Sequence, residues 1–398
     1  MKKLLVVSAV AATSLMASGY KIPEQSLNST ALSGAYVSNT SAADAAYYNP
    51  ANMAFMSSDK HLELNAMYIH LNPIEFSGSV GGSEDHTAES ASEDFVIPQI
   101  YVVSTPLDEN EDFRLGLSVN APAGLSKRWP SGVEAAFAEE FTLKVIEVNP
   151  TLSYRIMDNL AIAVGARFVY SEGIIKTSSE GGGLDLEGNS WDLGYNLALS
   201  YKPYESWGMA LTYRSNVDLT EEGGDTFTHP TYGTMTTPAS VTVPLPAVLT
   251  IATDVDVTDS TNLELVYERA FWSAYDELNI KIPAFGTLPG QPADKSWEDT
   301  NTVRLGLTQE LDDYFDLMLG LAYDETPVPE KTLGFELPDS NAIIFSGGIR
   351  WAVNDAFDIG AAVLYDAKED RTVSSDTIDG TFSGSSALLV SVGLGYRF

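Results

Sequence analysis

Apolar and polar residues alternate along most of this 398-residue chain. In the run 160–170, mainly large apolar residues occupy the even positions, and Ala, Gly, Arg and Val occupy the odd ones. The run 388–398 repeats the pattern up to a terminal Phe398. Strict alternation predicts strands with two unlike faces. The length of the runs and their aromatic ends favour a membrane β-barrel. A soluble β-sandwich is the alternative, because it would also segregate its large residues.

The alternation predicts fourteen strands, joined in turn by short and long connections. The strands are 61–71, 94–105, 112–121, 141–156, 160–172, 187–202, 206–217, 239–255, 261–274, 298–310, 314–324, 341–352, 356–366 and 382–398. The long connections are 72–93, 122–140, 173–186, 218–238, 275–297, 325–340 and 367–381. An even strand number with short periplasmic turns and long external loops is typical of bacterial outer-membrane barrels. We therefore expect an all-β, transmembrane antiparallel β-barrel of about 14 strands in the Gram-negative cell outer membrane.

Aromatic residues mark both ends of the predicted strands. At the short connections they are Tyr154, Tyr201, Trp207, Trp351, Phe357, Tyr396 and Phe398, and toward the long connections they are Tyr170, Tyr213, Tyr323 and Tyr365. Rings of this kind form girdles where a barrel meets the lipid headgroups. The terminal Tyr396-Arg397-Phe398 also resembles the aromatic C-terminal signature of outer-membrane proteins.

The first residues predict export. Lys2 and Lys3 precede an apolar stretch at 4–16, and small residues follow at 17–19. This is the layout of a secretory signal peptide, which we assign to residues 1–18. A retained N-terminal anchor is the alternative, but the stretch is shorter than the ~20 apolar residues of a membrane helix.

The net charge and the composition limit the kinds of molecule that the protein could bind. The formal net charge is −33, which argues against nucleic acid because no basic patch could neutralise phosphates. There are no cysteines, so no disulfides hold the exported chain. The acidic residues gather at 84–94, 221–225, 294–299 and 366–376, which we interpret as solvated loops. Divalent-cation binding by these loops is the alternative, although no calcium-loop spacing occurs.

No enzyme signature is present. The chain lacks G-x-S-x-G, Walker and H-E-x-x-H motifs, and its four histidines have no triad or zinc spacing. We predict that the protein is not an enzyme and needs no cofactor or metal. A barrel enzyme that assembles its site from separate strands is the alternative, because such a site leaves no local motif.

Residues 19–59 do not alternate and are rich in Ala, Ser, Asn and Gly. Such a segment in front of a barrel at 60–398 is either a periplasmic tail or a plug, since small residues permit close packing in a wide lumen. Within it, Asn49-Pro50-Ala51 predicts a turn, because proline excludes the preceding residue from helix and asparagine can bond its own backbone.

Three passages resemble the long-chain fatty acid and hydrophobic-compound transporter (FadL/TodX) family. They are Gly19-Tyr20-Lys21-Ile22-Pro23-Glu24, Asn49-Pro50-Ala51, and Ala121-Pro122-Ala123-Gly124-Leu125 with Trp129 ahead of Val148-Asn149-Pro150. The resemblance implies a barrel plugged by an N-terminal hatch at 19–59, with Tyr20 and Ile22 reaching a hydrophobic ligand site. It also implies lateral exit of ligand through a kink in the third strand, where Gly116 could relax the ladder.

Further ligand contacts are expected on the inward faces. If the large stripes face lipid, six arginines face the lumen: Arg114, Arg155, Arg167, Arg214, Arg304 and Arg350. Arg167, on an otherwise apolar inner face, is our candidate for a ligand carboxylate; the alternative is that these arginines pair with inward acids and with the hatch. Phe95 and Tyr101 are further candidates, because their strand is apolar on both faces.

The family's basic ligand-site residue cannot be carried over to this chain. Glu172 or its neighbours occupy that position, so a neutral hydrocarbon is an alternative to a fatty acid. Leu125, Trp129, Val133 and Phe137 could form an external capture groove, or could pack within the loop.

The sequence thus favours passive outer-membrane uptake of hydrophobic small molecules, with lateral exit into the bilayer. Expected partners are the hydrophobic ligand (a fatty acid or hydrocarbon), outer-membrane lipid and lipopolysaccharide, and the barrel is expected to be monomeric. A general diffusion porin or a surface adhesin barrel is the alternative function.

Overall fold

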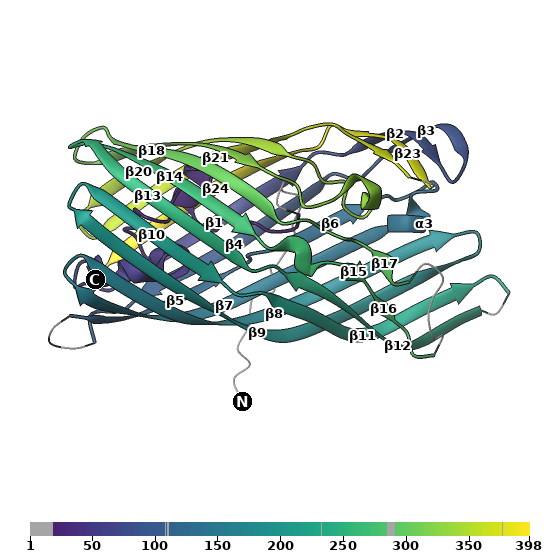
Figure 1. The fold of residues 1–398 in the computed structure, drawn as a ribbon, viewed down its shortest axis with the longest axis horizontal. Coiled ribbons are helices and arrows are strands. Elements are labelled where there is room, and N and C mark those ends of the chain that lie inside the picture. The colour runs from purple at the N-terminus through teal and green to yellow at the C-terminus, as the bar shows by residue number, and fades with distance from the viewer. Residues whose placement is uncertain (1–18, 108, 110, 232, 285–290, 376) are drawn as a thin grey trace.

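The computed structural model describes residues 19–107, 109, 111–231, 233–284, 291–375 and 377–398. The signal peptide predicted at 1–18 lies outside the described residues. The chain forms a closed antiparallel barrel (Figure 1), which confirms the prediction of an all-β fold with fourteen wall strands. The wall strands are β1 (His61–Leu71), β4 (Glu93–Val103), β5 (Phe113–Asn120), β7 (Glu140–Met157), β8 (Leu160–Ser179), β9 (Gly182–Tyr204), β10 (Trp207–Arg214), β13 (Val248–Thr258), β14 (Thr261–Ala270), β18 (Thr300–Glu310), β19 (Phe315–Asp324), β20 (Ala342–Asn354), β21 (Phe357–Lys368) and β24 (Ser386–Arg397).

The first wall strand closes the barrel against the last. β1 pairs with β24 over the whole of its length, with Met67 opposite Ser391. This pairing joins the two ends of the sheet, so the wall closes on itself.

The two faces of the wall differ as the alternation predicted. On β8, Val164 is 49% exposed and Phe168 is 41% exposed, while Arg167 between them is 2% exposed. An apolar face turned outward all round a closed sheet matches the lipid-facing surface of an outer-membrane barrel. A soluble sandwich would bury these large residues, so that alternative is wrong. Among the described residues, no helix is long and apolar enough to cross a membrane.

Two of the predicted loops are instead strands. β8 and β9 run on through the predicted connection 173–186, and β11 (Val217–His229) and β12 (Gly233–Leu245) form a hairpin where 218–238 was expected to be a loop. Cross-strand threonine pairs join this hairpin, as at Thr226 and Thr236. The acidic and glycine-rich run 221–225 interrupts the alternation that begins β11, so the sequence predicted a loop there.

The predicted strand 239–255 is also two strands. β12 ends at Leu245 and β13 begins at Val248. Pro246 lies between them, and its missing N–H interrupts the ladder.

A third predicted loop, 72–93, contributes to a small external sheet. This sheet consists of β2 (Glu75–Val80), β3 (Ser83–Glu89), β22 (Arg371–Ser374) and β23 (Ile378–Ser383). The predicted last strand 382–398 is therefore divided between β23 and β24. Phe76, Phe335, Phe382 and Trp129 pack beneath the sheet with ring centroids 4.9–6.4 Å apart. The other external elements are short: α3 (Ala135–Ala138), η2 (Trp272–Ala274), β15 (Glu277–Leu278), β16 (Ile280–Lys281), β17 (Ala293–Asp294) and η3 (Glu330–Thr332).

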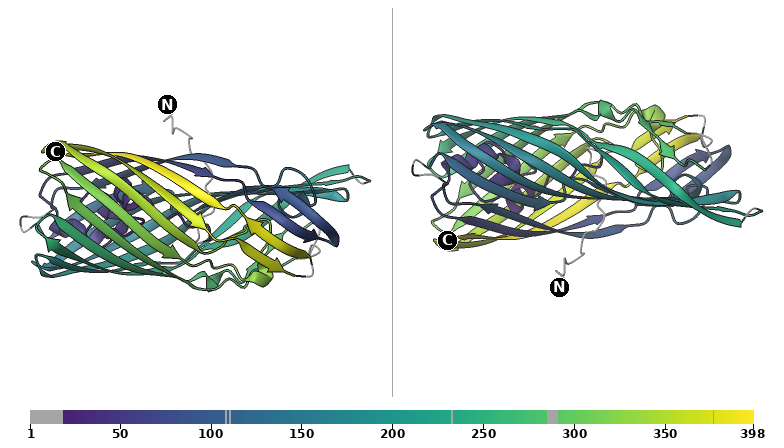
Figure 2. Two further views of the ribbon diagram at one scale, coloured as in Figure 1. Left: turned by 90° about the horizontal axis from the view of Figure 1, so that it is seen from above. Right: turned by 90° about the horizontal axis from the view of Figure 1, so that it is seen from below.

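Residues 19–59 lie inside the barrel, where Figure 2 shows them in purple. They contain α1 (Leu27–Ala31), α2 (Ala45–Tyr48) and the 3-10 helix η1 (Pro50–Phe55). Inward side chains of the wall hold their backbone: Glu264 accepts hydrogen bonds from Val37 N at 2.7 Å and Ser38 N at 2.6 Å. Small wall residues give them room, since a Cβ on Gly320 would lie 2.2 Å from the carbonyl carbon of Leu32.

The third strand is interrupted. β5 ends at Asn120, the chain leaves the wall at 121–123, and β6 (Gly124–Arg128) resumes pairing with β7. β4 pairs with β5 only from Ile100 to Val103, so residues 94–99 of β4 have no register partner on that side within the described chain. The break is not at Gly116 as expected, because Gly116 is in register with Val103 and Thr151. Pro122, which has no N–H to donate, lies at the interruption.

Candidate hydrophobic ligand site

The N-terminal residues fill the break in the third strand from inside. Lys21 forms an isolated antiparallel bridge with Ala123. Ile22 N donates to Pro122 O at 2.9 Å, and Gly124 N donates to Tyr20 O at 2.9 Å. The chain start therefore acts as a short inner strand that satisfies backbone groups which the wall leaves unpaired.

The side chain of Gln25 holds the same break. Its Nε2 donates to Ala121 O at 2.8 Å, and its Oε1 accepts from Ala121 N at 3.1 Å. Nε2 also donates to Ile22 O at 2.8 Å. One amide thus satisfies both backbone groups of Ala121 and ties them to the N-terminal residues.

An apolar cavity, which we call the outer cavity, lies beside this inner strand toward the long loops. Its empty volume is about 650 Å³, including its open side. Aliphatic and aromatic side chains make most of its wall, among them Tyr20, Leu125, Leu143, Ile175, Val243 and Trp297. Trp272 packs edge-on against Tyr20 with centroids 4.7 Å apart, so the Tyr20 ring is fixed from behind.

Few polar groups reach the outer cavity. The Tyr20 hydroxyl is already used, because it donates to Pro244 O at 2.5 Å. The ammonium of Lys295 pairs with the carboxylate of Glu336. Glu221 lines the cavity at 2% exposure, and its Oε1 has no hydrogen-bond partner among the described residues. A bound molecule would therefore contact one carboxyl oxygen without a hydrogen-bond partner in otherwise apolar surroundings.

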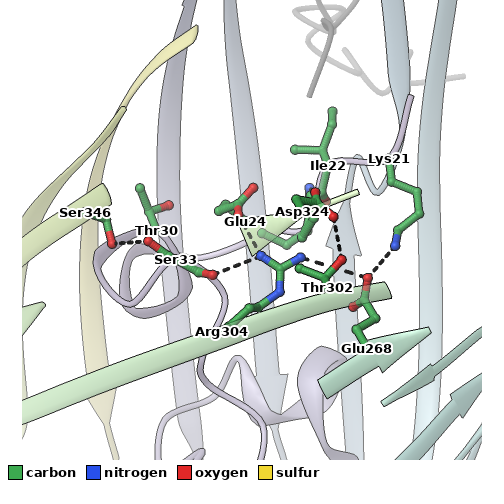
Figure 3. A network of polar contacts seen from close by, with 12 residues as sticks. Lys21, Ile22, Glu24, Thr30, Ser33, Glu268, Thr302, Arg304, Asp324 and Ser346 are labelled. Atoms are coloured by element: carbon green, nitrogen blue, oxygen red, sulfur yellow. Dashed lines mark hydrogen bonds and ion pairs between the residues drawn. The ribbon is translucent and has the colours of Figure 1, made fainter. Parts of the chain in front are cut away.

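A second cavity of about 720 Å³, the inner cavity, lies deeper in the lumen and is highly charged. Arg167 Nε lies 2.7 Å from Glu147, which also pairs with Arg214. Figure 3 shows the neighbouring network around Arg304, whose guanidinium lies 3.5 Å from Glu24 and 3.9 Å from Glu268. Lys21 pairs with Glu268 in the same network, so these cations already have carboxylate partners.

The predicted ligand residues are divided between these places. Tyr20 lines the outer cavity, while Ile22 and Arg167 line the inner one. Phe95 packs in one apolar cluster with Ile22. Tyr101 lines neither cavity, because its hydroxyl donates to Gln25 O and its ring packs against the lumen segment. Ligand contact by these residues stays a prediction.

The predicted external groove residues lie in one cluster. Leu125 lines the outer cavity. The indole N–H of Trp129 donates to Phe335 O at 2.8 Å, and the ring is buried. Val133 and Phe137 pack against the same cluster. The contacts of Trp129, Val133 and Phe137 are those of loop packing, and capture of ligand by these residues stays a prediction.

The Asn-Pro-Ala turn caps a helix inside the lumen. Asn49 Oδ1 accepts from Ala51 N at 3.3 Å, and Pro50 is the first residue of η1. Asn49 Nδ2 donates to Val37 O at 3.0 Å, which ties the turn to the rest of the segment. Proline suits this position because its missing N–H has no helical partner there.

Gln25, Glu221, Lys295 and the tryptophans of the outer cavity were not anticipated from the sequence. The sequence could have indicated Glu221. Val217, Leu219 and Glu221 alternate along β11 and are all buried, so an acidic residue lies on an otherwise apolar face. Among the described residues, no group of three or more His, Asp or Glu side chains is arranged to hold a metal ion.

Comparison with known proteins identifies the family. The family model described as outer membrane protein transport protein (OMPP1/FadL/TodX) matches residues 8–398. The chain is 24% identical to the long-chain fatty acid transport protein of Escherichia coli, over 99% of this chain and 98% of that protein. It is 26% identical to the 47 kDa outer membrane protein of Pasteurella multocida, over 98% and 96% of the two chains.

Solved structures share the fold. A Pseudomonas aeruginosa FadL homologue has a TM-score of 0.85 at 17% identity, covering 96% of this chain and 100% of that one. The Pseudomonas putida toluene transporter TodX has a TM-score of 0.72 at 16% identity, covering 96% and 100%. The family consists of transport proteins, which confirms the expectation that the chain is not an enzyme. The chain belongs to the OMPP1/FadL/TodX family of outer-membrane transport proteins.

Proposed function

We propose that this protein carries hydrophobic small molecules passively across the outer membrane, through the outer cavity and then sideways into the bilayer. One observation carries the proposal: an apolar cavity adjoins an interrupted wall strand, and the same N-terminal residues border both. The names of the relatives, a long-chain fatty acid transport protein and a toluene transporter, support a hydrophobic cargo.

Burial in the cavity supplies the affinity. Moving about 300 Å² of apolar ligand surface out of water contributes about 7.5 kcal/mol at ~25 cal/mol per Å², before the cost of association. Lipopolysaccharide slows apolar solutes, so a binding site open to the outside gives them a faster route. No energy source is needed, because the ligand leaves into a phase that also dissolves it.

Residues 19–59 act as the hatch in this proposal. A ligand that enters the outer cavity competes for the space of Tyr20, and displacement of Tyr20 breaks the bridge between Lys21 and Ala123. The interruption at 121–123 then faces the unpaired edge of β4 at 94–99, which gives the ligand a lateral way out. The exposed apolar girdle contacts lipid and lipopolysaccharide. Because β1 pairs with β24 and closes the wall within one chain, a single barrel suffices.

The filled lumen argues against a general diffusion porin. Side chains of 19–59 are mostly buried against the inner wall, and ion pairs join them to it, as between Glu24 and Arg304. A porin keeps a continuous water-filled channel instead.

Uptake in cells tests the proposal. Cells that lack their own transporter of this kind are given the wild-type chain, and uptake of labelled apolar probes is compared with uptake of a small sugar. We expect faster uptake of at least one apolar probe and unchanged uptake of the sugar. Val243→Trp, which fills the outer cavity, should abolish the gain, whereas Val257→Trp on the outward face should not. Equal stimulation of sugar and apolar probes would favour the porin.

A further inference from the structure

Glu221 is placed as a recognition group in the outer cavity. It continues the inward apolar face of β11 after Leu219, and it is 2% exposed. Gly173 on β8 makes room for it, since a Cβ there would lie 1.8 Å from Glu221 Oε2. Oε1 of the carboxyl has no hydrogen-bond partner among the described residues. A buried polar atom without a partner is costly unless something else supplies the hydrogen bond.

The position of Glu221 also favours its uncharged form. Tyr195 and Tyr213, whose rings lie 6.1 Å apart, mark the outer aromatic rim, and Glu221 lies beyond them in the external part of β11. Burial is the main cause that raises the pKa of Glu221 to about 8; Ser171 opposes the rise and the nearby charge of Asp192 adds to it. At neutral pH the carboxyl therefore keeps its proton for most of the time and can both donate and accept.

The cation of the outer cavity is not available to a ligand. Among the described lining residues, Lys295 is the one positively charged side chain, and its ammonium is paired with Glu336. The backbone of Lys295 is held as well, because Thr332 Oγ1 donates to Lys295 O at 2.8 Å and Lys295 N donates to Asp276 O at 2.8 Å. A ligand carboxylate would have to displace Glu336 while it approached a second acid.

We propose that the outer cavity selects uncharged hydrophobic molecules that carry a hydroxyl, such as long-chain alcohols and alkylphenols, and that Glu221 receives this hydroxyl. The inference rests on the proposed function and specifies its substrate class. The apolar wall holds the chain or ring of the ligand, Glu221 orients its polar end, and the Lys295–Glu336 pair excludes a carboxylate.

Binding to the purified full chain in lipid nanodiscs tests this selection. Trp297 lines the cavity and Trp272 backs Tyr20, so tryptophan fluorescence reports occupancy. The probes are 1-decanol, decane and decanoate, which share a chain and differ at one end. We expect 1-decanol to bind at least about tenfold more tightly than decanoate, because the charged end of decanoate would have to displace Glu336 from Lys295.

Two variants separate the two halves of the proposal. Glu221→Leu should weaken 1-decanol about tenfold and leave decane unchanged, because only the alcohol uses the carboxyl. Glu336→Gln releases Lys295 and should strengthen decanoate about tenfold. Glu222→Gln, at the exposed neighbouring position, is the matched control and should change nothing. The heat-dependent shift of the folded band on gels checks that each variant is folded.

Decanoate binding to the wild type as tightly as 1-decanol would overturn the inference and leave the proposed function standing. A Glu221→Leu variant that is folded and binds 1-decanol with unchanged affinity would overturn it as well. If no probe of any class quenched the tryptophans, the inference and the proposed function would both fail.

Discussion

Replacing Gln25 with leucine removes the amide that closes the broken strand while keeping a side chain of similar size. Three hydrogen bonds are lost, and the N–H and C=O of Ala121 are left unpaired in a position that is 5% exposed. Leaving a buried backbone N–H or C=O without a hydrogen-bond partner costs about 1–3 kcal/mol. Two such groups therefore favour detachment of the N-terminal residues by at least about 2 kcal/mol, which corresponds to about a 30-fold larger open population.

Hydrogen exchange followed by mass spectrometry measures this directly. The amides of Ile22 and Gly124, which bridge the inner strand and the break, should exchange at least about 30-fold faster in Gln25→Leu. Gln99→Leu is the matched control, because Gln99 is also buried and its side-chain amide has no hydrogen-bond partner among the described residues. Unchanged protection of both amides in Gln25→Leu would refute the claim that Gln25 holds the break.

Three further changes probe the hatch and its charges. Gly320→Val forces a clash with the Leu32 backbone and should make residues 19–59 sensitive to added protease, whereas Gly347→Val, whose nearest contact is a leucine methyl at 3.2 Å, should not. Arg167→Met leaves the buried Glu147 with one cation, so the free energy of unfolding in urea should fall by about 3 kcal/mol; a loss of ligand binding without destabilisation would instead assign Arg167 to the ligand. Burial lowers the pKa of Lys127 to about 7, so its charged form destabilises the fold below pH 7 by up to about 5 kcal/mol, and this penalty disappears as the pH rises through 10.5. Lys127→Met should therefore raise the unfolding temperature at pH 6 and have little effect at pH 11, and an equal effect at both values would contradict this.

The wall was predictable because one physical constraint acts on every strand. A wall strand meets lipid on one side and the lumen on the other, so the contrast repeats at every second residue. β1 begins and ends where the alternation does, at His61 and Leu71. The hairpin of β11 and β12 was mistaken for a loop, because the acidic and glycine-rich run 221–225 interrupts its alternation.

The site was predictable only in part. Tyr20 came from the resemblance of the chain start to a family, and the break in the third strand was expected five residues too early, at Gly116. Met53 packs against Gly116, and the strand stays in register with both neighbours there. Pro122 was assigned to a loop although it marks the interruption. Glu221 was missed because its acidic neighbours suggested a solvent-exposed loop. It lies two residues after Leu219 on the same strand, so its side chain is on the same buried face.

A reversible covalent lock tests the central claim most directly. Lys21 and Ala123 face each other in the non-hydrogen-bonded position of an antiparallel pair, where Cα atoms lie about 4.5 Å apart, a spacing that a disulfide can span. The chain has no cysteine of its own, so Lys21→Cys combined with Ala123→Cys can form only this bond within one chain. Each single cysteine variant controls for the loss of its side chain.

Uptake of an apolar probe is then measured before and after reduction. If the inner strand must leave the break for the ligand to pass, the oxidised double variant takes up no more probe than cells without the protein, and a reductant restores uptake to the level of the single variants. Full uptake with the disulfide intact would contradict the account, because the ligand would then be crossing the membrane without opening the wall.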